Sequence, residues 1–490
     1  MFVRPVILLA LAWILAGASP SAVDADPVGG LAGDQPKAIG PEDAAILLST
    51  LSNAPSQGFD ANAFDPGPAA ALLGSADPVS HSRGEQLLAA VSVAYARAQH
   101  GERLEGRFPG NWAIRPAAYD GTADFKAALE DHRIADWVAT LPPPEQRYQR
   151  LVAAYARYQA IATGGGWRSL ATSPTLKPGA TGPAVEALRQ RLAAEDPAIA
   201  ATEPAPGTPA SGAAPPVASY DAVLAAAVSR AQVRYGLNAS GVLNAATIAA
   251  LNVPVDRRLA QITANLERLR WSPRSLPSYR VELNIADASL ALYDAGAPAL
   301  EMRVIVGRPS KQTPMFEDGI KAVVFNPPWN VPADIAAREV WPRIRRDPGY
   351  MAREGYVVRP GGGLQQLPGP RCALGNIKFD LSNPFGVYLH DTPSRSLFAR
   401  DSRALSHGCM RLEKPNALAE RLLAGDPAWP ETRIDFAIAG GKTVRAPLMT
   451  PVPLYVFYWT AFVDDDGQVE FRQDVYHWDE RLLALLARRR

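Results

Sequence analysis

The chain has 490 residues, of which 50 are Lys or Arg and 49 are Asp or Glu, and 47% are hydrophobic. At roughly 100–200 residues per domain, this length predicts several folding units, and the apolar content excludes a wholly disordered chain. A formal net charge of +1 gives no indication of a nucleic-acid-binding surface or a polybasic membrane-binding surface. Two cysteines exclude a disulfide-rich scaffold and a zinc site made of cysteine alone. Function is therefore expected to depend on a specific site.

The N-terminus has the pattern of an export signal. Arg4 precedes an apolar stretch from Val6 to about Ala16, and small residues continue to Ala25. We predict a signal peptide over residues 1–25 that is cleaved after Ala25. The alternative is an uncleaved membrane anchor, but the apolar run is shorter than the roughly 20 residues that span a bilayer. No later segment reaches that length without a charge, so we expect a mature protein with no stable membrane span, outside the cytoplasm.

Residues 26–168 are predicted to form a helical scaffold domain. Alanine and leucine recur at helical spacing over residues 43–51 and again over residues 85–97. The histidines of this region have no recognisable partner spacing and are interpreted as surface or packing residues: His81, His100 and His132.

Residues 169–254 are predicted to form a second, smaller helical domain. Residues 179–188 have the pattern Gly-x-x-Gly-x-x-Val-x-x-Leu, and residues 235–252 contain Tyr-Gly-Leu, Gly-x-Leu and Thr-x-x-x-Leu-Asn. These patterns resemble the three-helix peptidoglycan-binding domain, although core positions of any helical hairpin would give similar leucines. Residues 193–219 are rich in Ala and Pro and are predicted to form a solvated loop.

The hydrophobic pattern of the sequence changes in its second half, from helical spacing to alternation. Residues 255–277 carry a helical apolar stripe and are predicted to form a linking helix. After it, alternating apolar residues predict strands over residues 279–285, 290–293 and 302–306. We therefore expect residues 278–490 to form a β-rich domain.

A cysteine and a histidine in this domain are candidates for nucleophilic catalysis. Cys409 lies nineteen residues after His390, in the sequence Ser406-His-Gly-Cys-Met-Arg-Leu. The thiolate is the reactive form of cysteine, and a neighbouring imidazole can accept its proton and lower its pKa. Gly408 has no Cβ, so backbone N–H groups of this turn can face a substrate carbonyl oxygen. Tyr388 lies two residues before His390 in a strand, so the two side chains share a face.

Two other interpretations of these residues are open. His390, Asp391, His407 and Cys409 together contain the donor types of a zinc site, but their spacing is not one of the common zinc patterns. Cys409 and Cys372 could form a disulfide in an exported protein. The residues alone do not decide whether His390 or His407 acts as the base.

The motif Ser-His-Gly-Cys-Met-Arg with an upstream histidine resembles the signature of L,D-transpeptidases with the YkuD-type catalytic domain. Residues 306–314, 325–332 and 390–398 strengthen the resemblance to the larger Gram-negative members. This resemblance implies a multidomain α+β protein with a helical scaffold, a peptidoglycan-binding-like domain and a β-rich catalytic domain with an inserted cap. We assign the cap to about residues 334–367. Its glycines 361–363 are interpreted as a flexible boundary or as an ordinary surface turn.

The resemblance also implies roles for the motif residues. Cys409 is the nucleophile and His390 accepts and donates the proton, while the backbone carbonyl of Asp391 orients the imidazole. In this family pattern His407 contributes mainly backbone, which favours His390 as the base.

The remaining motif residues are expected to shape the cleft. His407 and Gly408 supply backbone donors, and Tyr388 and Asp391 line the cleft. Arg411 is expected to bind a substrate carboxylate or to form a structural ion pair. Cys372 has no counterpart in the family pattern and is expected to be dispensable, with a reversible bond to Cys409 as the alternative.

The implied function is a periplasmic transpeptidase of cell wall biogenesis that acts on peptidoglycan stem peptides. Cys409 would attack the diaminopimelate carbonyl of a tetrapeptide stem, release D-Ala, and pass the acyl group to another diaminopimelate in a 3-3 cross-link. The same acyl-enzyme could serve an L,D-carboxypeptidase, or attach an envelope protein. No metal and no organic cofactor is implied. An alternative from another class is a catalytically inert wall-binding structural protein.

Overall fold

The computed structural model describes residues 38–171, 175–201 and 218–488. The predicted signal peptide, residues 1–25, lies outside these ranges, as do residues 202–217 of the predicted Ala/Pro-rich loop. Within the described ranges, no helix combines the length and the apolar character needed to cross a membrane.

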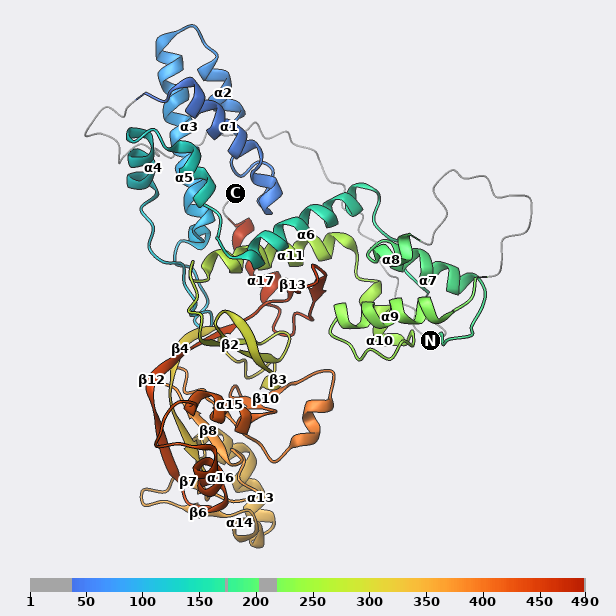
Figure 1. Cartoon of the computed structure of the whole chain (residues 1–490), viewed down its shortest axis with the longest axis vertical. Coiled ribbons are helices and arrows are strands. Elements are labelled where there is room, and N and C mark those ends of the chain that lie inside the picture. Colours follow the sequence, from blue (N-terminus) through green and yellow to red (C-terminus); the bar gives the residue numbers. More distant parts are fainter. Residues whose placement is uncertain (1–37, 172–174, 202–217, 489–490) are drawn as a thin grey trace, which may run out of the picture.

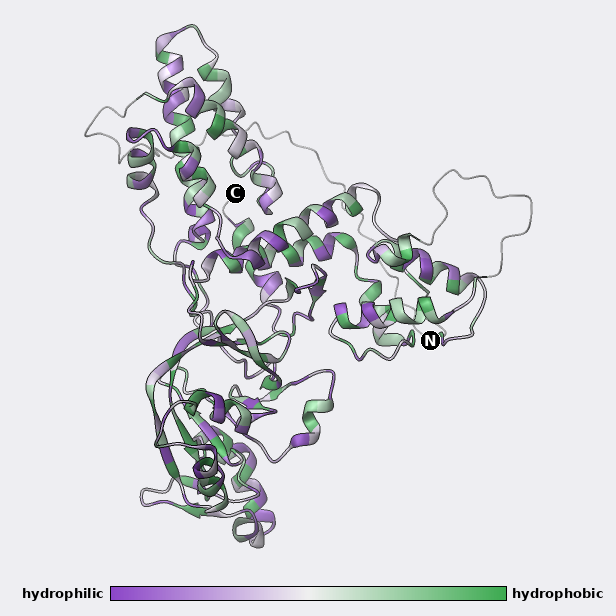
Figure 2. Ribbon diagram, in the orientation of Figure 1, coloured by the Kyte–Doolittle hydropathy of each residue, from purple (hydrophilic) through white to green (hydrophobic). Residues whose placement is uncertain are grey.

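The N-terminal region is helical, as the sequence predicts (Figure 1). Its elements are α1 (Pro41–Ser52), η1 (Ala54–Gln57), α2 (Gly67–Leu73), α3 (Pro78–Gln99), η2 (Glu102–Leu104), α4 (Gly121–Glu130), α5 (Ile134–Thr140) and α6 (Gln146–Thr163). Local sequence explains where α3 begins, because Pro78 occupies its first position and the Asp77 carboxylate accepts the Ser80 N–H. Hydrophobic and hydrophilic residues alternate along these helices (Figure 2), and α1, α3, α4 and α5 bury their apolar sides in one core.

The next region is the small helical domain with its linking helix. It contains α7 (Pro183–Ala193), α8 (Pro197–Ala200), α9 (Ala222–Arg234), α10 (Ala245–Leu251) and α11 (Val255–Trp271). Three of these helices correspond to the predicted three-helix domain, and α8 is a short addition. Gly182 has φ 111°, a backbone conformation that favours glycine, immediately before the start of α7. Helix α6 packs along α11 rather than within the first core (Figure 1).

A buried polar cluster joins this domain to its neighbours. Glu195 is 1% exposed and accepts hydrogen bonds from Arg191 at 2.7 Å, from the Tyr158 hydroxyl at 2.6 Å and from the Tyr235 hydroxyl at 2.5 Å. Tyr158 belongs to α6, whereas Arg191 and Tyr235 belong to the small domain. Residues 195–200, which the sequence assigned to a solvated loop, therefore form a buried polar contact and a short helix. Composition did not reveal this, because the Ala and Pro content of the segment hides its two acidic residues.

The C-terminal domain is built on one sheet. Its strands are β1 (Arg280–Asn284), β2 (Ser289–Asp294), β3 (Ala297–Gly307), β4 (Phe316–Phe325), β8 (Ile377–Asp380), β9 (Leu389–His390), β10 (Ala404–Ser406), β11 (Met410–Leu412) and β12 (Val444–Phe457). In the described part of the chain these nine strands have the order β10-β3-β11-β9-β8-β4-β12-β1-β2. Because β2 also pairs with β3, the sheet closes on itself around a common core.

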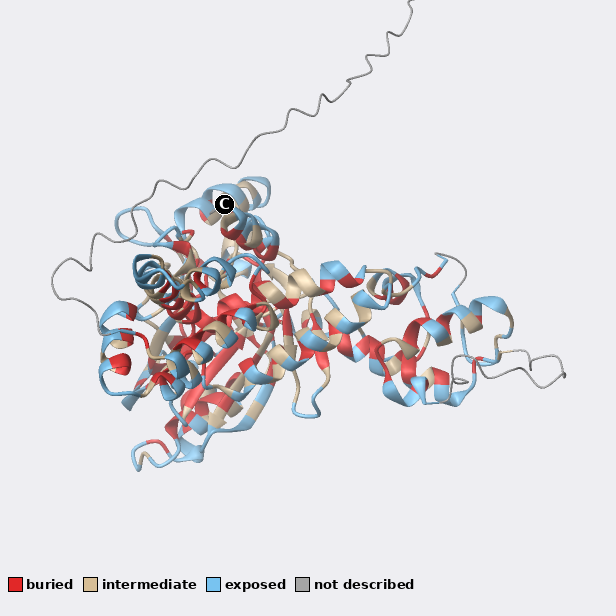
Figure 3. Ribbon diagram, turned by 90° about the horizontal axis from the view of Figure 1, so that it is seen from above, coloured by how far each residue is buried: buried red, intermediate tan, exposed pale blue. Residues whose placement is uncertain are grey.

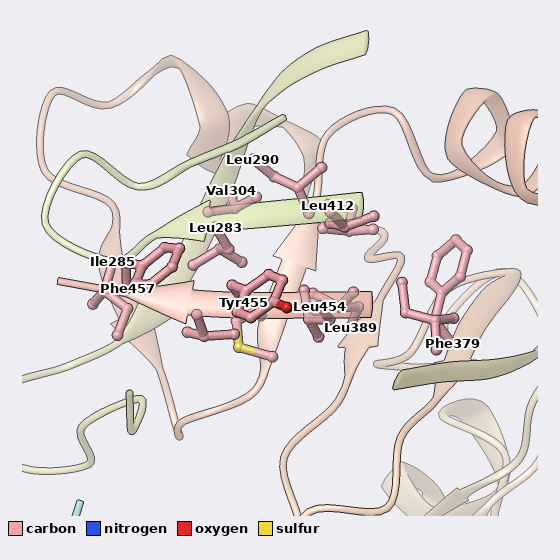
Figure 4. Close-up of a cluster of buried hydrophobic side chains, with 14 of the residues drawn as sticks. Leu283, Ile285, Leu290, Val304, Phe379, Leu389, Leu412, Leu454, Tyr455 and Phe457 are labelled. Atoms are coloured by element: carbon pink, nitrogen blue, oxygen red, sulfur yellow. The ribbon is translucent and has the colours of Figure 1, made fainter. Parts of the chain in front are cut away.

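Apolar side chains from opposite parts of this sheet fill its interior. Figure 4 shows Leu283, Val304, Leu389, Leu412 and Leu454 pointing into this cluster, and all five are fully buried. Buried residues accordingly follow the strands of the sheet (Figure 3). The other elements of the domain are η4 (Arg395–Ala399), α15 (Pro415–Leu423), α16 (Glu431–Ala439), β13 (Ala461–Val463), β14 (Val469–Phe471) and α17 (Trp478–Ala487). The packed interior gives the short strands β9 and β11 a rigid base.

A subdomain inserted between β4 and β8 forms the cap. It consists of β5 (Trp329–Asn330), α12 (Ala333–Ile335), the π-helical turn η3 (Ala336–Val340), α13 (Trp341–Arg346), α14 (Gly349–Arg353), β6 (Tyr356–Val358) and β7 (Leu364–Gln366). Val331, Val340, Tyr356 and Leu364 contribute to a small core of its own. Glycines 361–363 lie in the hairpin turn between β6 and β7, where the Arg359 N–H donates to the Gly363 carbonyl at 2.7 Å. They form an ordinary surface turn and are not at the boundary of the cap.

Candidate active site

Strands β9 and β11 bring the two halves of the motif together. They pair in parallel, with Met410 beside Leu389 and Arg411 beside His390. Leu389 and Met410 are fully buried in the core of the sheet. Since successive side chains of a strand point to opposite faces, His390 and Arg411 lie together on the other face.

Cys409 and Tyr388 extend this pairing by one residue and lie on the same face as His390. The Met410 N–H donates to the Tyr388 carbonyl at 3.0 Å, which continues the ladder to these two residues. A side-chain hydrogen bond joins Tyr388 to Cys409, and a second one joins Tyr388 to Trp329 at the base of the cap. Burial raises the pKa of Tyr388, so its hydroxyl keeps its proton. The residue predicted to line the cleft therefore contacts the candidate nucleophile directly.

The imidazole of His390 is held as a neutral base. It is 4% exposed, and its Nδ1 lies 2.5 Å from the carbonyl oxygen of Asp391. A carbonyl only accepts, so Nδ1 carries the hydrogen and Nε2 keeps a free lone pair. Burial, followed by the charges of Arg411 and Lys378, lowers the pKa of His390 from its ordinary value of 6.5 to about 3. At neutral pH this histidine is uncharged and able to accept a proton.

The Asp391 side chain fixes the carbonyl that orients His390. Its carboxylate accepts the Asn376 N–H at 2.8 Å and the Thr392 N–H at 2.7 Å, and forms an ion pair with Arg395 at 2.9 Å. The sequence assigned Asp391 a backbone role only. In the structure the Asp391 side chain is also part of the site, because it is 4% exposed and makes the hydrogen bonds and the ion pair given above.

Gly375 permits the close approach of Asp391, which leads to a testable difference between two glycines. A Cβ on Gly375 would lie 2.3 Å from Asp391 Oδ2, whereas a Cβ on Gly386 would meet nothing within 4 Å. Both have similar positive φ values, 61° and 66°, so the backbone strain of an alanine is matched. We expect Gly375→Ala to slow turnover at least ~10-fold because the orientation of His390 is disturbed, and Gly386→Ala to have little effect. Equal kinetics of the two variants would contradict this role of Asp391.

The Cys409 thiol is neutral in this environment. Burial raises its pKa above the ordinary value, and hydrogen bonds from Tyr388 together with the charges of Arg411 and Lys378 oppose that effect only in part. The expectation of a lowered thiol pKa is therefore wrong. The reason is desolvation, which sequence spacing does not report, and which penalises the thiolate more than its neighbours stabilise it. The resting site contains a neutral thiol and a neutral imidazole.

Cys372 does not form a disulfide with Cys409, and both are free thiols. Cys372 is 1% exposed, and its sulfur lies 3.4 Å from the carbonyl oxygen of Pro327. Burial raises its pKa. The structure thus contradicts the disulfide interpretation and leaves the Cys409 sulfur free to react.

The turn before Cys409 depends on Gly408. Gly408 has φ 118°, and its carbonyl accepts the Thr313 hydroxyl at 2.8 Å. Its N–H donates to Ser406 Oγ at 3.1 Å, while that hydroxyl donates to the Cys409 carbonyl at 2.6 Å. The Gly408 N–H, which the sequence assigned to the cleft, is thus already engaged inside the turn.

Residues distant in the chain support this turn. Thr313 is fully buried, its hydroxyl oxygen accepts the Gly307 N–H at 2.9 Å, and its own N–H donates to the Tyr476 hydroxyl at 3.2 Å. The scaffold region contributes Asn111, whose amide donates to Gln312 at 2.7 Å. Sequence reasoning missed Asn111 and Tyr476, because no local pattern links a scaffold residue or a C-terminal residue to the motif.

Arg411 carries a charge that is not compensated by a carboxylate. Its Nε is buried with no hydrogen-bond partner, and none of the ion pairs among the described residues includes it. Lys378, by contrast, pairs with Asp380 at 3.0 Å. Of the two roles expected for Arg411, this arrangement favours binding of a ligand carboxylate over a structural ion pair.

His407 points to the cap and not to the imidazole of His390. Its Nε2 lies 2.6 Å from Oε1 of Glu339 in η3. Glu339 was not predicted to belong to the site, because its position depends on how the cap folds back. Within residues 38–171, 175–201 and 218–488, no three His, Cys, Asp or Glu side chains are grouped so that they could hold a metal ion.

Comparison with known families and proteins agrees with the sequence patterns. Residues 278–429 match the family described as L,D-transpeptidase catalytic domain (YkuD), residues 33–154 match the family described as Scaffold domain, and residues 181–251 match the family described as "Putative peptidoglycan binding domain".

Individual proteins match parts of the chain. A "Putative L,D-transpeptidase" of Haemophilus influenzae is 34% identical over 244 residues, which are 45% of this chain and 48% of that protein. The chain thus spans about half the length of this curated relative. Two solved structures are also similar. The L,D-transpeptidase from Mycobacterium smegmatis is 16% identical, and the match covers 36% of this chain and 58% of that chain with a TM-score of 0.21. L,D-transpeptidase 3 from Mycobacterium tuberculosis is 15% identical, and the match covers 37% of this chain and 61% of that chain with a TM-score of 0.20.

The family match confirms the resemblance that the motif around Cys409 indicates. Residues 278–429 match the L,D-transpeptidase catalytic domain family, in a chain whose other parts match a scaffold domain and a putative peptidoglycan binding domain.

Proposed function

We propose that this protein is a cysteine-dependent L,D-transpeptidase that acts on peptidoglycan stem peptides in the periplasm. The observation that carries the proposal is the register of β9 and β11, which puts the thiol of Cys409, the neutral imidazole of His390 and the guanidinium of Arg411 on one face. A nucleophile, a base and a carboxylate-binding group on one face are what acyl transfer from a peptide requires.

Acylation begins from the neutral pair. As the Cys409 sulfur attacks the carbonyl of diaminopimelate, its proton passes to Nε2 of His390, and the S–C bond forms. The Asp391 carbonyl keeps Nδ1 of the resulting imidazolium hydrogen-bonded. When the C–N bond to the terminal D-Ala breaks, His390 returns the proton to the leaving amine, and the product is a thioester on Cys409.

Charge that develops on the carbonyl oxygen needs donors. The Tyr388 hydroxyl is a candidate, because it stays protonated and already contacts Cys409. The backbone N–H of Cys409 is the second candidate, since the Gly408 N–H is occupied by Ser406. Arg411 holds a carboxylate of the stem peptide close to the sulfur.

The acceptor decides the product. An amine of another diaminopimelate gives up a proton to His390, attacks the thioester, and forms a 3-3 cross-link with release of the thiol. Water in the same step gives an L,D-carboxypeptidase, and an amine of an envelope protein gives attachment to the wall. The peptidoglycan-binding domain supports a substrate in the cell wall, and the predicted signal peptide supports the periplasm.

The proposal is tested with the mature protein and tetrapeptide-bearing muropeptides. We expect the intact mass of the protein to increase by the mass of the stem without its terminal D-Ala, located on the peptide that contains Cys409. Cross-linked dimers should follow in the product mixture. Retention of sacculi without any covalent adduct would indicate a wall-binding protein and would refute the proposed activity.

A further inference from the structure

Three cationic or hydrogen-bonding side chains next to the nucleophile turn are paired with two carboxylates of the cap. Lys311 Nζ lies 2.9 Å from Asp334 Oδ2, and His407 Nε2 lies 2.6 Å from Glu339 Oε1. Arg308 Nη2 approaches the same Glu339 oxygen at 3.8 Å. Asp334 belongs to α12 and Glu339 to η3, so the first helical turns of the cap contact the catalytic core through acidic side chains.

These three side chains are close to the thiol along the fold. His407 is separated from Cys409 by one residue, and the Arg308 N–H donates to the carbonyl of Ser406 at 2.9 Å. Lys311 follows in the same loop, where its own N–H donates to the Arg308 carbonyl at 2.8 Å. A peptide acylated on Cys409 would therefore extend past them.

The pairing with the cap is incomplete and readily exchanged. The Nε atom of Arg308 is buried without a hydrogen-bond partner, and 3.8 Å is too long for a hydrogen bond from its Nη2. The side chains of Arg308, Lys311, Asp334 and Glu339 are 36–43% exposed, and ion pairs this exposed contribute little to stability. Arg308 thus has unused capacity for a carboxylate, and the Arg308 and Lys311 pairs with the cap are weak.

We propose that Arg308, Lys311 and His407 form a subsite for a carboxylate of the substrate, and that Glu339 and Asp334 occupy this subsite when no substrate is bound. The identity of the ligand rests on the proposed function. A stem peptide that ends in diaminopimelate and D-Ala offers two carboxylates of this chemistry, the second carboxylate of diaminopimelate and the C-terminal one. Either of these carboxylates can replace Glu339 and Asp334. The positive charges of Arg308 and Lys311 then stay compensated while the cap separates from the loop that carries them.

Alkylation of Cys409 tests the subsite without any transpeptidase reaction. Iodoacetate and iodoacetamide differ in charge but alkylate the same sulfur, and peptide mass mapping separates Cys409 from Cys372. The measured quantity is the rate of Cys409 alkylation by iodoacetate divided by its rate of alkylation by iodoacetamide. We expect Glu339→Gln to raise the ratio about threefold, because a competing carboxylate is removed, and Arg308→Gln to lower it by a similar factor.

The matched control is Asp347→Asn. It removes one negative charge from the same cap, but Asp347 pairs with Arg353 inside the cap. We expect its ratio to stay within experimental error of the wild type. Asp334→Asn provides a second variant on the Lys311 pair. Unchanged ratios in Glu339→Gln, Arg308→Gln and Asp334→Asn would overturn the proposal, and so would an equal shift in the control.

Matched stem peptides identify which carboxylate binds. One tetrapeptide stem carries an amide at the second carboxylate of diaminopimelate, and another carries an amide at its C-terminus. If an amide at one carboxylate raises the KM of the wild type relative to the unmodified stem, but does not change the KM of Arg308→Gln, that carboxylate is the one that the subsite binds. If neither amide has this effect, the subsite does not serve the stem peptide. If no stem is turned over but the alkylation ratios shift, the proposed function fails and the carboxylate subsite stands.

Discussion

Cys409→Ala is expected to abolish acylation by stem peptides while the protein remains folded. The sulfur is the proposed nucleophile, and the neighbouring Tyr388 hydroxyl keeps its proton, so alanine leaves no thiol in the site to carry the acyl group. Alanine fits the space of the thiol, and a half-buried position tolerates the loss of one sulfur atom. We expect no adduct by intact mass and a melting temperature within a few degrees of the wild type.

Cys372→Ser provides the matched control for this variant. It removes the other thiol of the chain, but Cys372 is buried against Pro327 and its pKa is raised by burial. We expect full acylation on Cys409 under reducing conditions and without reductant. An adduct on Cys372 in the Cys409→Ala protein, or loss of acylation in Cys372→Ser, would assign the nucleophile differently.

Short-range sequence patterns predicted the parts of the site that depend on strands and turns. The period of two residues in a strand put Tyr388 and His390 on one face, and the glycine before Cys409 indicated a turn. Helical spacing and alternation also predicted the order of helical and β-rich regions. These features depend on neighbours in the chain, which a sequence displays directly.

Contacts between distant segments were not predictable in the same way. Asn111 reaches Gln312 across 201 positions, and Glu339 reaches His407 across 68. The raised pKa of Cys409 depends on how far its surroundings remove water from the sulfur, which no spacing rule contains. The Glu195 cluster was hidden for the same reason, because its partners come from three helices that only tertiary packing brings together.

His390→Gln is expected to slow acylation of Cys409 by at least ~100-fold, because the proton of a neutral thiol then has no acceptor. Glutamine keeps a similar size and polarity, so the strand β9 should retain its packing. His407→Gln is the matched control, since His407 bonds Glu339 through Nε2 and contacts the cap. We expect that variant to remain within about tenfold of the wild type, as measured by the rate of adduct formation. A larger loss in His407→Gln than in His390→Gln would make His407 the base.

The pH dependence of acylation separates a His390 with a lowered pKa from one with the ordinary value. His390 has a pKa of about 3 in the folded protein against an ordinary value of 6.5. Its Nε2 thus stays unprotonated at pH 5, and the rate should change little between pH 7 and pH 5. With a histidine of the ordinary pKa, the rate would fall about 25-fold over that interval. An acid limb centred near pH 6.5 would contradict the lowered pKa of His390.

Stability should respond to the same lowered pKa with a definite sign. The unfolded chain protonates His390 below about pH 6.5, whereas the folded protein resists protonation until the pH approaches 3. The contribution of His390 to stability is therefore complete above pH 6.5 and is lost as the pH falls. His100, whose pKa is lowered to about 4 by burial, adds a loss of the same sign. We expect the melting temperature to fall from pH 7 to pH 4.5, and to fall less steeply in His390→Gln. A slope identical to that of the wild type would show that His390 is protonated equally in both states, and would remove the physical basis for treating it as a neutral base.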